Sequence, residues 1–227
     1  RYVLVDAGAL VRLPDGLGAR EAALAEPLAV ALHGITRSEI RLGDTAMVLG
    51  AGPIGALTVA GLVARGLGPV TVVEPALPRQ ALARAIGAAE VLTPDDLPIF
   101  PLWEPERISP RAVDVVFECS GKKTAMEAGL AQLRRGGRLV LMGAGIEPPR
   151  FDPNRMLLNE LTVCGSFVYD ADGFDRALGL LAAPGALPTD VLIEPDDVPL
   201  DRLGATLDGL ATGRIAGKVM VVPREAL

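Results

Sequence analysis

Apolar positions along the chain form two alternating patterns. Short continuous apolar runs occupy residues 45–49, 70–73, 89–92, 113–118, 138–142 and 161–166. Segments between them carry apolar residues at helical spacing, at residues 54–65, 78–85 and 124–133. Runs of the first kind are typical of buried parallel strands, which helices connect. The pattern therefore predicts an α/β fold with a doubly wound, Rossmann-type parallel sheet of about six strands.

Both ends of the chain depart from this alternation. Residues 2–5 and 9–13 predict two short strands, and residues 191–193 and 218–223 predict two more near the other end. Two strands alone are only marginally stable. We therefore expect both ends to be remnants of a second, mostly β domain. The alternative for the first two strands is a simple hairpin on the main domain.

A glycine-rich turn connects the strand at residues 45–49 to the helix at residues 54–65. Its spacing is Gly50-x-Gly52-x-x-Gly55, in which each glycine has a separate use. Gly50 permits the sharp turn, Gly52 lets a pyrophosphate approach the backbone, and Gly55 lets the helix pack closely on the strand. In this context the spacing predicts a dinucleotide-binding site. The alternative is a turn that only connects a strand to a helix.

The residues around this turn indicate which dinucleotide would bind. Pro53 and Ile54 open the helix, whose unpaired N–H groups and partial positive charge favour phosphates. Glu74 ends the next strand and can accept hydrogen bonds from both ribose hydroxyls of an adenosine. A 2′-phosphate would meet a like charge there, so Glu74 favours NAD over NADP. Arg79 weakens the argument for NAD, because its side chain can stack on adenine or pair with a phosphate of the cofactor.

Composition narrows the function classes. Half of the residues are apolar and only 4% are aromatic, so Ala, Val, Leu and Ile must build the core, as suits parallel strands covered by helices. The net charge is −6 without a basic cluster, which argues against nucleic acid as a partner. No apolar run reaches the roughly 20 residues that span a bilayer, no signal-peptide pattern is present, and two cysteines make no disulfide framework. We expect a cytoplasmic protein without a membrane partner.

Few side chains outside the glycine turn have catalytic or metal-binding chemistry. Glu26 precedes Pro27 at a predicted helix entrance, where its backbone is biased toward an extended form. Its carboxylate there either faces a site or caps the helix, and spacing alone favours the cap. The other candidate zinc ligands are His33, Cys119 and Cys164. We expect both cysteines to be small core residues, and His33 lies about two helical turns from Glu26, too far to share one ion.

Further stretches follow one another in an order typical of a known family. They are EPLAVALH (26–33), LGDT (42–45), GAGPIG (50–55), VEP (73–75), FECSG (117–121), GGRLV (136–140), NELTVCGS (159–166) and GKV (217–219). Together they resemble the medium-chain dehydrogenase/reductase family, most closely its zinc-dependent alcohol, polyol and threonine dehydrogenase branch. The resemblance covers nearly the whole chain.

The resemblance implies a two-domain enzyme. Residues 1–33 would be the end of a GroES-like catalytic domain, residues 34–168 the Rossmann NAD-binding domain, and residues 169–227 the return to the catalytic domain. In this family the GroES-like barrel carries the catalytic zinc and most of the substrate pocket. We expect most of that barrel, and with it the other zinc ligands, to lie outside this chain.

The implied reaction is hydride transfer between the nicotinamide and the carbon of a secondary alcohol or ketone, with zinc polarising the oxygen in the full-length enzyme. Only Glu26 matches a position near the zinc, so the resemblance favours the site over the cap. The resemblance also implies that Ser120, Gly143 and Ala144 contact the cofactor, because each lies at the end of a predicted strand. The family also implies a homodimer or homotetramer that pairs through the strand at residues 161–166.

Two other functions stay open. One is a zinc-free, NADP-dependent reductase of the quinone reductase branch, against which Glu26-Pro27 and Glu74 argue. The other is a truncated, non-catalytic nucleotide-binding module, which stays open because the sequence contains no complete set of zinc ligands.

Overall fold

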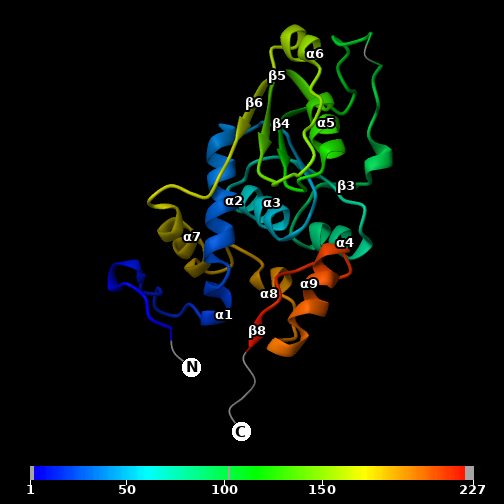
Figure 1. Cartoon of the computed structure of the whole chain (residues 1–227). Coiled ribbons are helices and arrows are strands. Elements are labelled where there is room, and N and C mark those ends of the chain that lie inside the picture. The colour runs from blue at the N-terminus through cyan, green and yellow to red at the C-terminus, as the bar shows by residue number, and fades with distance from the viewer. Residues whose placement is uncertain (1–2, 102, 223–227) are drawn as a thin grey trace.

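The computed structural model describes residues 3–101 and 103–222. Its centre is a parallel sheet with the strand order β3-β2-β1-β4-β5-β6 (Figure 1). The strands are β1 (Ala46–Leu49), β2 (Val70–Val73), β3 (Glu90–Leu92), β4 (Val113–Glu118), β5 (Leu133–Leu141) and β6 (Thr162–Gly165). Every neighbouring pair runs parallel, which confirms the predicted doubly wound sheet.

The strand order reverses beside β1. The chain leaves β1 toward β2 and β3, then returns to β4 on the other side. In such sheets ligands bind beyond the carboxyl ends of the strands, at the point of reversal. The register pairs Leu49 of β1 with Val73 of β2 and with Glu118 of β4. These three strands therefore end side by side at the place where a ligand is expected.

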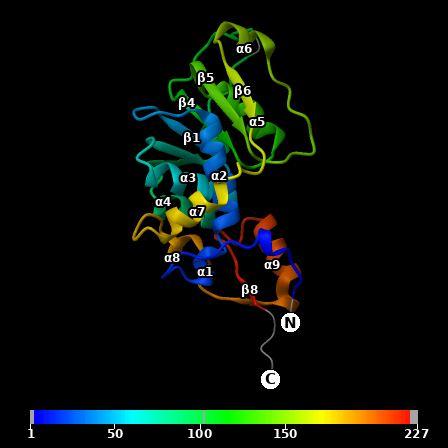
Figure 2. The same cartoon turned by 90° about the vertical axis from the view of Figure 1, so that its left-hand side faces the viewer.

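Helices cover both faces of the sheet (Figure 2). Alternate strand residues face opposite sides, so Ala46 and Val48 belong to one buried cluster and Met47 and Leu49 to another. The first cluster packs against α2 (Ala25–Ser38), α3 (Pro53–Ala64), α4 (Leu77–Ala85) and α7 (Gly173–Ala182). The second packs against α5 (Lys123–Ala131) and α6 (Pro153–Leu158).

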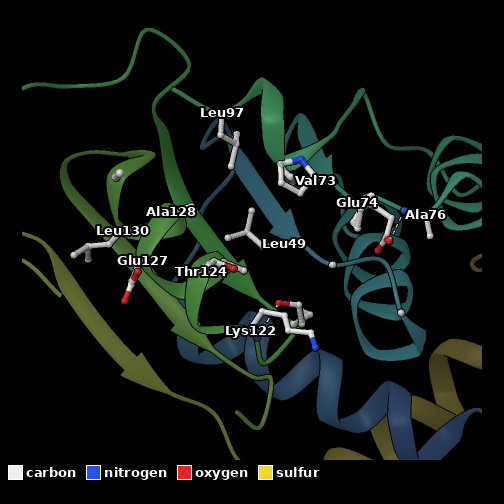
Figure 3. Close-up of a pocket in the computed structure, with 18 of the residues that line it drawn as sticks. Leu49, Val73, Glu74, Ala76, Leu97, Lys122, Thr124, Glu127, Ala128 and Leu130 are labelled. Carbon is white, nitrogen blue, oxygen red and sulfur yellow. Dashed lines mark hydrogen bonds between the residues drawn. The ribbon is translucent and has the colours of Figure 1, made fainter. Parts of the chain in front are cut away.

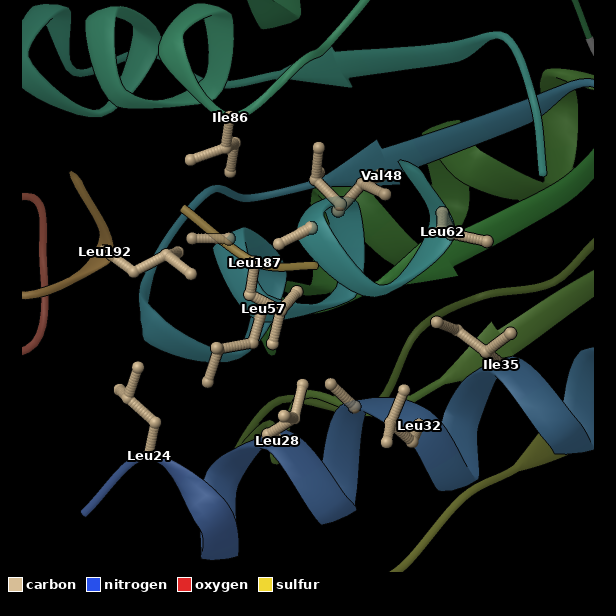
Figure 4. Packing of buried hydrophobic residues seen from close by; sticks show 14 of the residues in the cluster. Leu24, Leu28, Leu32, Ile35, Val48, Leu57, Leu62, Ile86, Leu187 and Leu192 are labelled. Atoms are coloured by element: carbon tan, nitrogen blue, oxygen red, sulfur yellow. The ribbon is translucent and has the colours of Figure 1, made fainter. Parts of the chain in front are cut away.

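Helix α3 lies buried between the sheet and α2 (Figure 4). Leu28 and Leu32 on one side of α2, and Leu24 just before the helix, point toward Leu57 of α3. All residues from 55 to 62 are buried. A helix that is apolar all round is expected to be buried on every side, so this packing explains the uniformly apolar segment after the glycine turn. It also fixes the direction of α3 beneath the turn.

Strand β5 begins earlier than the sequence pattern predicts. It starts at Leu133 and includes the pair Gly136-Gly137, which we expected to form a turn before the strand. The register with β4 shifts between Val113 and Val115, and Gly136 has a φ of 73°. Glycine adopts this conformation readily. The two glycines therefore serve as an irregularity within the strand.

The strand predictions at both ends are largely wrong. Residues 3–5 and 10–13 form no strand, and Val3 and Leu4 are 84% and 98% exposed. A strand needs a neighbour for its backbone groups, and no described strand lies beside them. Residue 2 of the first predicted strand lies outside the described residues. The first segment instead contains η1 (Ala7–Ala9) and α1 (Ala19–Ala22).

The C-terminal segment is mostly helical, with one short strand pair. β7 (Val198–Pro199) runs parallel to β8 (Val221–Val222), and residue 223 of the strand predicted at 218–223 lies outside the described residues. Residues 191–192 belong to a helix and not to a strand, and Ile193 forms an isolated bridge with Lys218. The remaining elements are α8 (Thr189–Leu192), η3 (Leu200–Arg202) and α9 (Leu203–Ala211), besides η2 (Pro94–Asp96) after β3.

The two end segments lie against each other below the sheet in Figure 1. Arg20 of α1 donates a hydrogen bond to the carbonyl oxygen of Glu194 (2.6 Å) and forms an ion pair with Asp197. The Glu194 carboxylate in turn accepts from the amide of Gly217 (2.7 Å). The division at residues 33 and 168 stays a prediction. Among the described residues, no helix is long and apolar enough to cross a membrane.

Candidate functional site

A cavity of about 1010 Å³ opens at the carboxyl ends of β1, β2 and β4. Leu49 lies near its middle, with Glu74 and Ala76 toward one end and Ala128 and Leu130 toward the other (Figure 3). The cavity is therefore elongated across the point where the strand order reverses. Its size and position suit an extended ligand such as a dinucleotide.

Two of the three glycines are required by the fold itself. Gly50 has a φ of 90°, and a Cβ there would lie only 2.9 Å from the Cβ of Ser120. A Cβ on Gly55 would collide with the carbonyl oxygen of Gly50. Gly50 lines the cavity, whereas the buried Gly55 does not. Both therefore have the structural uses that their spacing predicts.

Gly52 is a glycine that the fold does not need. Its φ is −65° and its ψ is −177°, which any residue can adopt. An added Cβ would meet only the Arg79 guanidinium, at 3.9 Å. Gly52 lines the cavity and precedes the open N-terminus of α3, which has no side-chain cap. A missing side chain in open space, beside free N–H groups, is the arrangement that a phosphate requires.

Of the residues that open α3, Pro53 lines the cavity and Ile54 does not. Pro53 is the first residue of the helix, where its missing N–H costs no hydrogen bond. The carbonyl oxygen of Ile54 accepts from the Thr58 hydroxyl (2.9 Å). Because Ile54 does not line the cavity, its predicted contact with the cofactor is limited to its backbone N–H.

Glu74 is turned toward the glycine turn and is 3% exposed. Its Oε2 accepts from the amide of Ala51 (2.7 Å), and its Oε1 accepts from the amide of Ala76 (2.9 Å). Each carboxylate oxygen has a second lone pair. Glu74 therefore fixes the end of β2 against the glycine turn and can still accept hydroxyl donors from the cavity that it lines.

Arg79 joins the cavity to the C-terminal segment. Its guanidinium donates to the carbonyl oxygen of Leu210 in α9, and its Nε is buried without a hydrogen-bond partner in the described structure. Residues 210–213, at the end of α9 and just after it, line the cavity beside the start of α4, where Gly213 packs against Ala76. A segment from the end of the chain therefore closes the side of the cavity beside Glu74. Local sequence patterns gave no signal for this contact.

The ends of β4 and β5 form the other side of the glycine turn. Ser120 lines the cavity. Gly143 and Ala144 do not, since they pack against Gly121: a Cβ on Gly121 would collide with the carbonyl oxygen of Ala144. Burial raises the pKa of the Glu118 carboxyl, although hydrogen bonds from Ser120 and Gly121 act in the opposite direction. The sequence does not mark Glu118 as a site residue, because its contact with Met142 and Gly143 forms only once β4 and β5 pair.

The two cysteines lie in different environments. Burial, and secondarily the charge of Glu118, raise the pKa of the Cys119 thiol to about 12, so it carries no thiolate near neutral pH. Cys119 lies 3.9 Å from the sulfur of Met142. The thiol of Cys164 faces the carbonyl oxygen of Arg37 at 3.8 Å. Both environments fit the expectation that the cysteines are structural.

The other candidate metal ligands lie apart. Glu26 is exposed in the first turn of α2, so the predicted extended backbone before the helix is wrong. The helix starts at Ala25 because Pro27 is tolerated within a first turn. His33 Nδ1 lies 3.3 Å from a carboxylate oxygen of Asp170. In the described parts of the chain, no three His, Cys, Asp or Glu side chains are grouped to hold a metal.

A loop and a buried arginine complete the far end of the cavity. The segment at residues 97–101, which follows η2, lines it with Leu97 and Phe100. Arg155 of α6 is 7% exposed and donates to the carbonyl oxygen of Arg107 (2.8 Å), with its guanidinium 5.2 Å from the Phe100 ring centre. Burial lowers the pKa of Arg155. Sequence reasoning missed these residues because only the fold brings α6 to the loop.

Comparison with known proteins decides the family. A family model described as zinc-binding dehydrogenase matches residues 53–183, more than half of the chain. The chain belongs to the zinc-binding dehydrogenase family. The resemblance to zinc-dependent medium-chain polyol dehydrogenases is thereby confirmed, and the glycine turn, the Glu74 strand and β6 all lie on or beside the matched residues.

Two curated relatives are similar to most of this chain. The chain is 36% identical over 180 residues to 2-dehydro-3-deoxy-L-galactonate 5-dehydrogenase of Pseudoalteromonas atlantica, covering 79% of this chain and 52% of the relative. It is 36% identical over 177 residues to D-xylulose reductase of Saccharomyces cerevisiae, covering 76% of this chain and 49% of the relative. The chain thus spans about half the length of these relatives.

An NADP-bound structure from Sinorhizobium meliloti has the same fold. It superposes with a TM-score of 0.77 at 30% identity, over 94% of this chain and 61% of the solved one. The likeness extends beyond the sheet to both end segments, since it covers nearly all of this chain. The Rossmann-type architecture is therefore that of the family.

Proposed function

We propose that this chain is the cofactor-binding part of an NAD-dependent alcohol or polyol dehydrogenase, in which a hydride passes between the nicotinamide and the carbon of a secondary alcohol or ketone. Gly52 carries the proposal, because it is a glycine that the backbone does not require, set in open space at a helix N-terminus inside an elongated cavity. The sugar and polyol dehydrogenases among the relatives support this reaction class.

Different residues of the cavity suit different parts of a dinucleotide. The N–H groups that open α3 would hold the pyrophosphate above Gly52, and Glu74 would accept the ribose hydroxyls of the adenosine. Ser120 would contact the other half from the end of β4. NAD, when bound, supplies the hydride acceptor. The protein residues bind and orient it and exclude water from the cleft.

We infer a preference for NAD over NADP from the position of Glu74. A 2′-phosphate beside this carboxylate would meet a like charge, and the Arg79 guanidinium, which could compensate, is bonded to the carbonyl oxygen of Leu210. The NADP-bound relative shows that NADP binding occurs within the family. The preference in this chain therefore depends on Glu74 more than on the fold.

Titration calorimetry with NAD and NADP tests both parts of the proposal. We expect NAD to bind more tightly than NADP, and Glu74→Ser to narrow the difference because it removes the charge. Asp114→Asn, which changes a carboxylate at the opposite end of the sheet, is the matched control and should leave the preference unchanged. Tighter binding of NADP by the unsubstituted chain would contradict the preference, and binding of neither would contradict the cofactor site.

Zinc, which the family implies, has no ligand set among the described residues. The exposed Glu26 carboxylate is the single residue that we assign near a metal, and it lies on α2 outside the cavity. The described residues therefore form no zinc site by themselves. In our proposal the metal belongs to the full-length enzyme.

We further propose that the chain forms a homodimer or homotetramer through β6. Within residues 3–101 and 103–222, this strand has a neighbour on one side only, β5. Thr162 and Gly165 in it are exposed, and Phe167, which follows it, is 90% exposed. An open strand edge with an exposed aromatic residue next to it is suited to pairing with a second copy.

A further inference from the structure

Glu118 is a charged side chain buried at the end of β4. It is fully buried, and no basic side chain in the described structure pairs with it. Its Oε1 accepts from the amide of Ser120 (2.8 Å), the hydroxyl of Ser120 (2.5 Å) and the amide of Gly121 (3.0 Å). A carboxylate in such a place is costly unless donors satisfy it. The donors here all come from one turn, Ser120-Gly121, which we call the β4 turn.

The backbone of Glu118 holds a second turn. Its carbonyl oxygen accepts from the amides of Met142 and Gly143, each at 2.9 Å. These residues begin the β5 turn, residues 142–145, which follows β5. A Cβ on Gly143 would lie 3.0 Å from Glu118 Oε2. One residue therefore fixes both turns, one through its side chain and the other through its backbone.

The two turns are packed closely against each other, without room for a side chain between them. A Cβ on Gly143 would collide with the amide nitrogen of Gly121, and one on Gly145 would lie 2.6 Å from the carbonyl oxygen of Gly121. The β4 turn also touches the glycine turn, because a Cβ on Gly50 would lie 2.9 Å from the Ser120 Cβ. The turns thus form one block whose exposed side, at Ser120, faces the cavity.

The position of this block assigns it to one half of the cofactor. In a doubly wound sheet each half of a dinucleotide lies over one set of strands. Glu74 ends β2 and belongs to the adenosine side, whereas β4 and β5 lie on the other side of β1. The block therefore lies under the nicotinamide half, given the proposed function.

We propose that Glu118 is a positioning residue for the nicotinamide half of the cofactor. It does not touch the cofactor; it holds the β4 turn against the β5 turn, which lies behind it, and beside the glycine turn. Ser120 of the β4 turn and the backbone of the glycine turn therefore keep one fixed surface toward the cavity. The inference rests on the proposed function, since it presumes that the cavity binds NAD.

Binding of NAD and of AMP to the whole chain separates this role from a general effect on folding. AMP probes the adenosine side alone. We expect Glu118→Ala to weaken NAD binding about tenfold, the effect of losing a hydrogen bond to a charged group, and to leave AMP affinity unchanged within about twofold. Glu118→Gln keeps an acceptor at the Oε1 position and should restore most of the NAD affinity.

Asp114→Ala is the matched control. Asp114 lies at the opposite end of β4 and also accepts from an amide and a hydroxyl, both of Thr45 (2.8 and 2.6 Å). Its loss should weaken the sheet without changing the ratio of NAD to AMP affinity. If circular dichroism shows Glu118→Ala to be unfolded, Glu118→Asp withdraws the carboxylate by one methylene and has the same expected effect.

Two results would overturn the inference: an equal loss of NAD and AMP affinity in the Glu118 variant, or no loss of either. Failure of the proposed function looks different, because the unsubstituted chain would then bind neither NAD nor AMP. A loss confined to NAD, with rescue by Glu118→Gln, would support the positioning role.

Discussion

At the scale of single residues, the least expected feature is a buried carboxylate beside a predicted cofactor site. The Glu118 carboxylate accepts hydrogen bonds from the donors of the β4 turn. Burial raises the pKa of its carboxyl above the ordinary value of 4.5. A raised pKa means that the folded chain binds this proton more tightly than the unfolded chain does. The protonated Glu118 carboxyl therefore makes its full contribution to the free energy of unfolding below pH 4.5, and this contribution is lost as pH rises through the pKa of the folded chain.

This linkage predicts a pH-dependent effect of Glu118→Gln on stability. Relative to the unsubstituted chain, the variant should gain stability as pH rises above 4.5, because glutamine does not titrate whereas the buried carboxyl, with its raised pKa, must ionise. Urea unfolding of both chains at several pH values measures the difference, and other titrating groups cancel in the comparison. A difference that stays constant with pH would contradict the assignment.

Some site residues could be predicted from the sequence because their contacts are with residues close in the chain, whereas others contact residues far away. The uses of Gly50, Gly52 and Gly55 follow from spacing alone, since each depends on neighbours close in the chain. The hydrogen bonds of Glu118 to the β4 turn are also local, but their link to the β5 turn exists only once β4 and β5 pair. Arg79 contacts Leu210, 131 residues away. No sequence window contains both members of such a pair.

At the scale of elements, the sheet could be predicted because each strand is a buried apolar run followed by a helix. The strands expected near the N-terminus could not, because residues 3–5 and 10–13 have no partner strand in the described structure, and of the described part of the strand expected at 218–223 only Val221–Val222 pairs as a strand, with β7. Val3 and Leu4 are exposed, and the β-like pattern there reflects only composition. β5 was predicted too short, since Gly136-Gly137 usually signals a turn and here lies within a strand.

Burial of α3 between α2 and the sheet predicts a strong dependence on its core residues. Leu57 is 2% exposed, and Leu57→Ala should lower the free energy of unfolding by about 2–5 kcal/mol, because it removes buried contacts and leaves a cavity. Leu207→Ala, on the surface of α9 and 54% exposed, should change it by about 0.5 kcal/mol or less. Equal effects in denaturant unfolding would contradict the packing.

At the scale of the whole molecule, the open edge of β6 predicts self-association. Gel filtration should show a species larger than the 23.6 kDa chain. Phe167→Asp should weaken the association, because it places a charge next to the proposed contact. Leu77→Asp, at the start of α4 near the opposite edge of the sheet, should not. A single species at the mass of one chain would contradict the proposed pairing.

The central claim is that the cavity over the glycine turn binds NAD, and Gly52→Val tests it most directly. The backbone at Gly52 accepts a side chain without strain and the space is open, so the variant should fold and should lose the pyrophosphate site. Gly179→Val, on the exposed side of α7 with open space around it, is the control. In calorimetric titrations we predict that NAD binds to the unsubstituted chain and to Gly179→Val and gives no binding heat with Gly52→Val. Equal binding by all three chains, or none by a folded unsubstituted chain, would contradict the account.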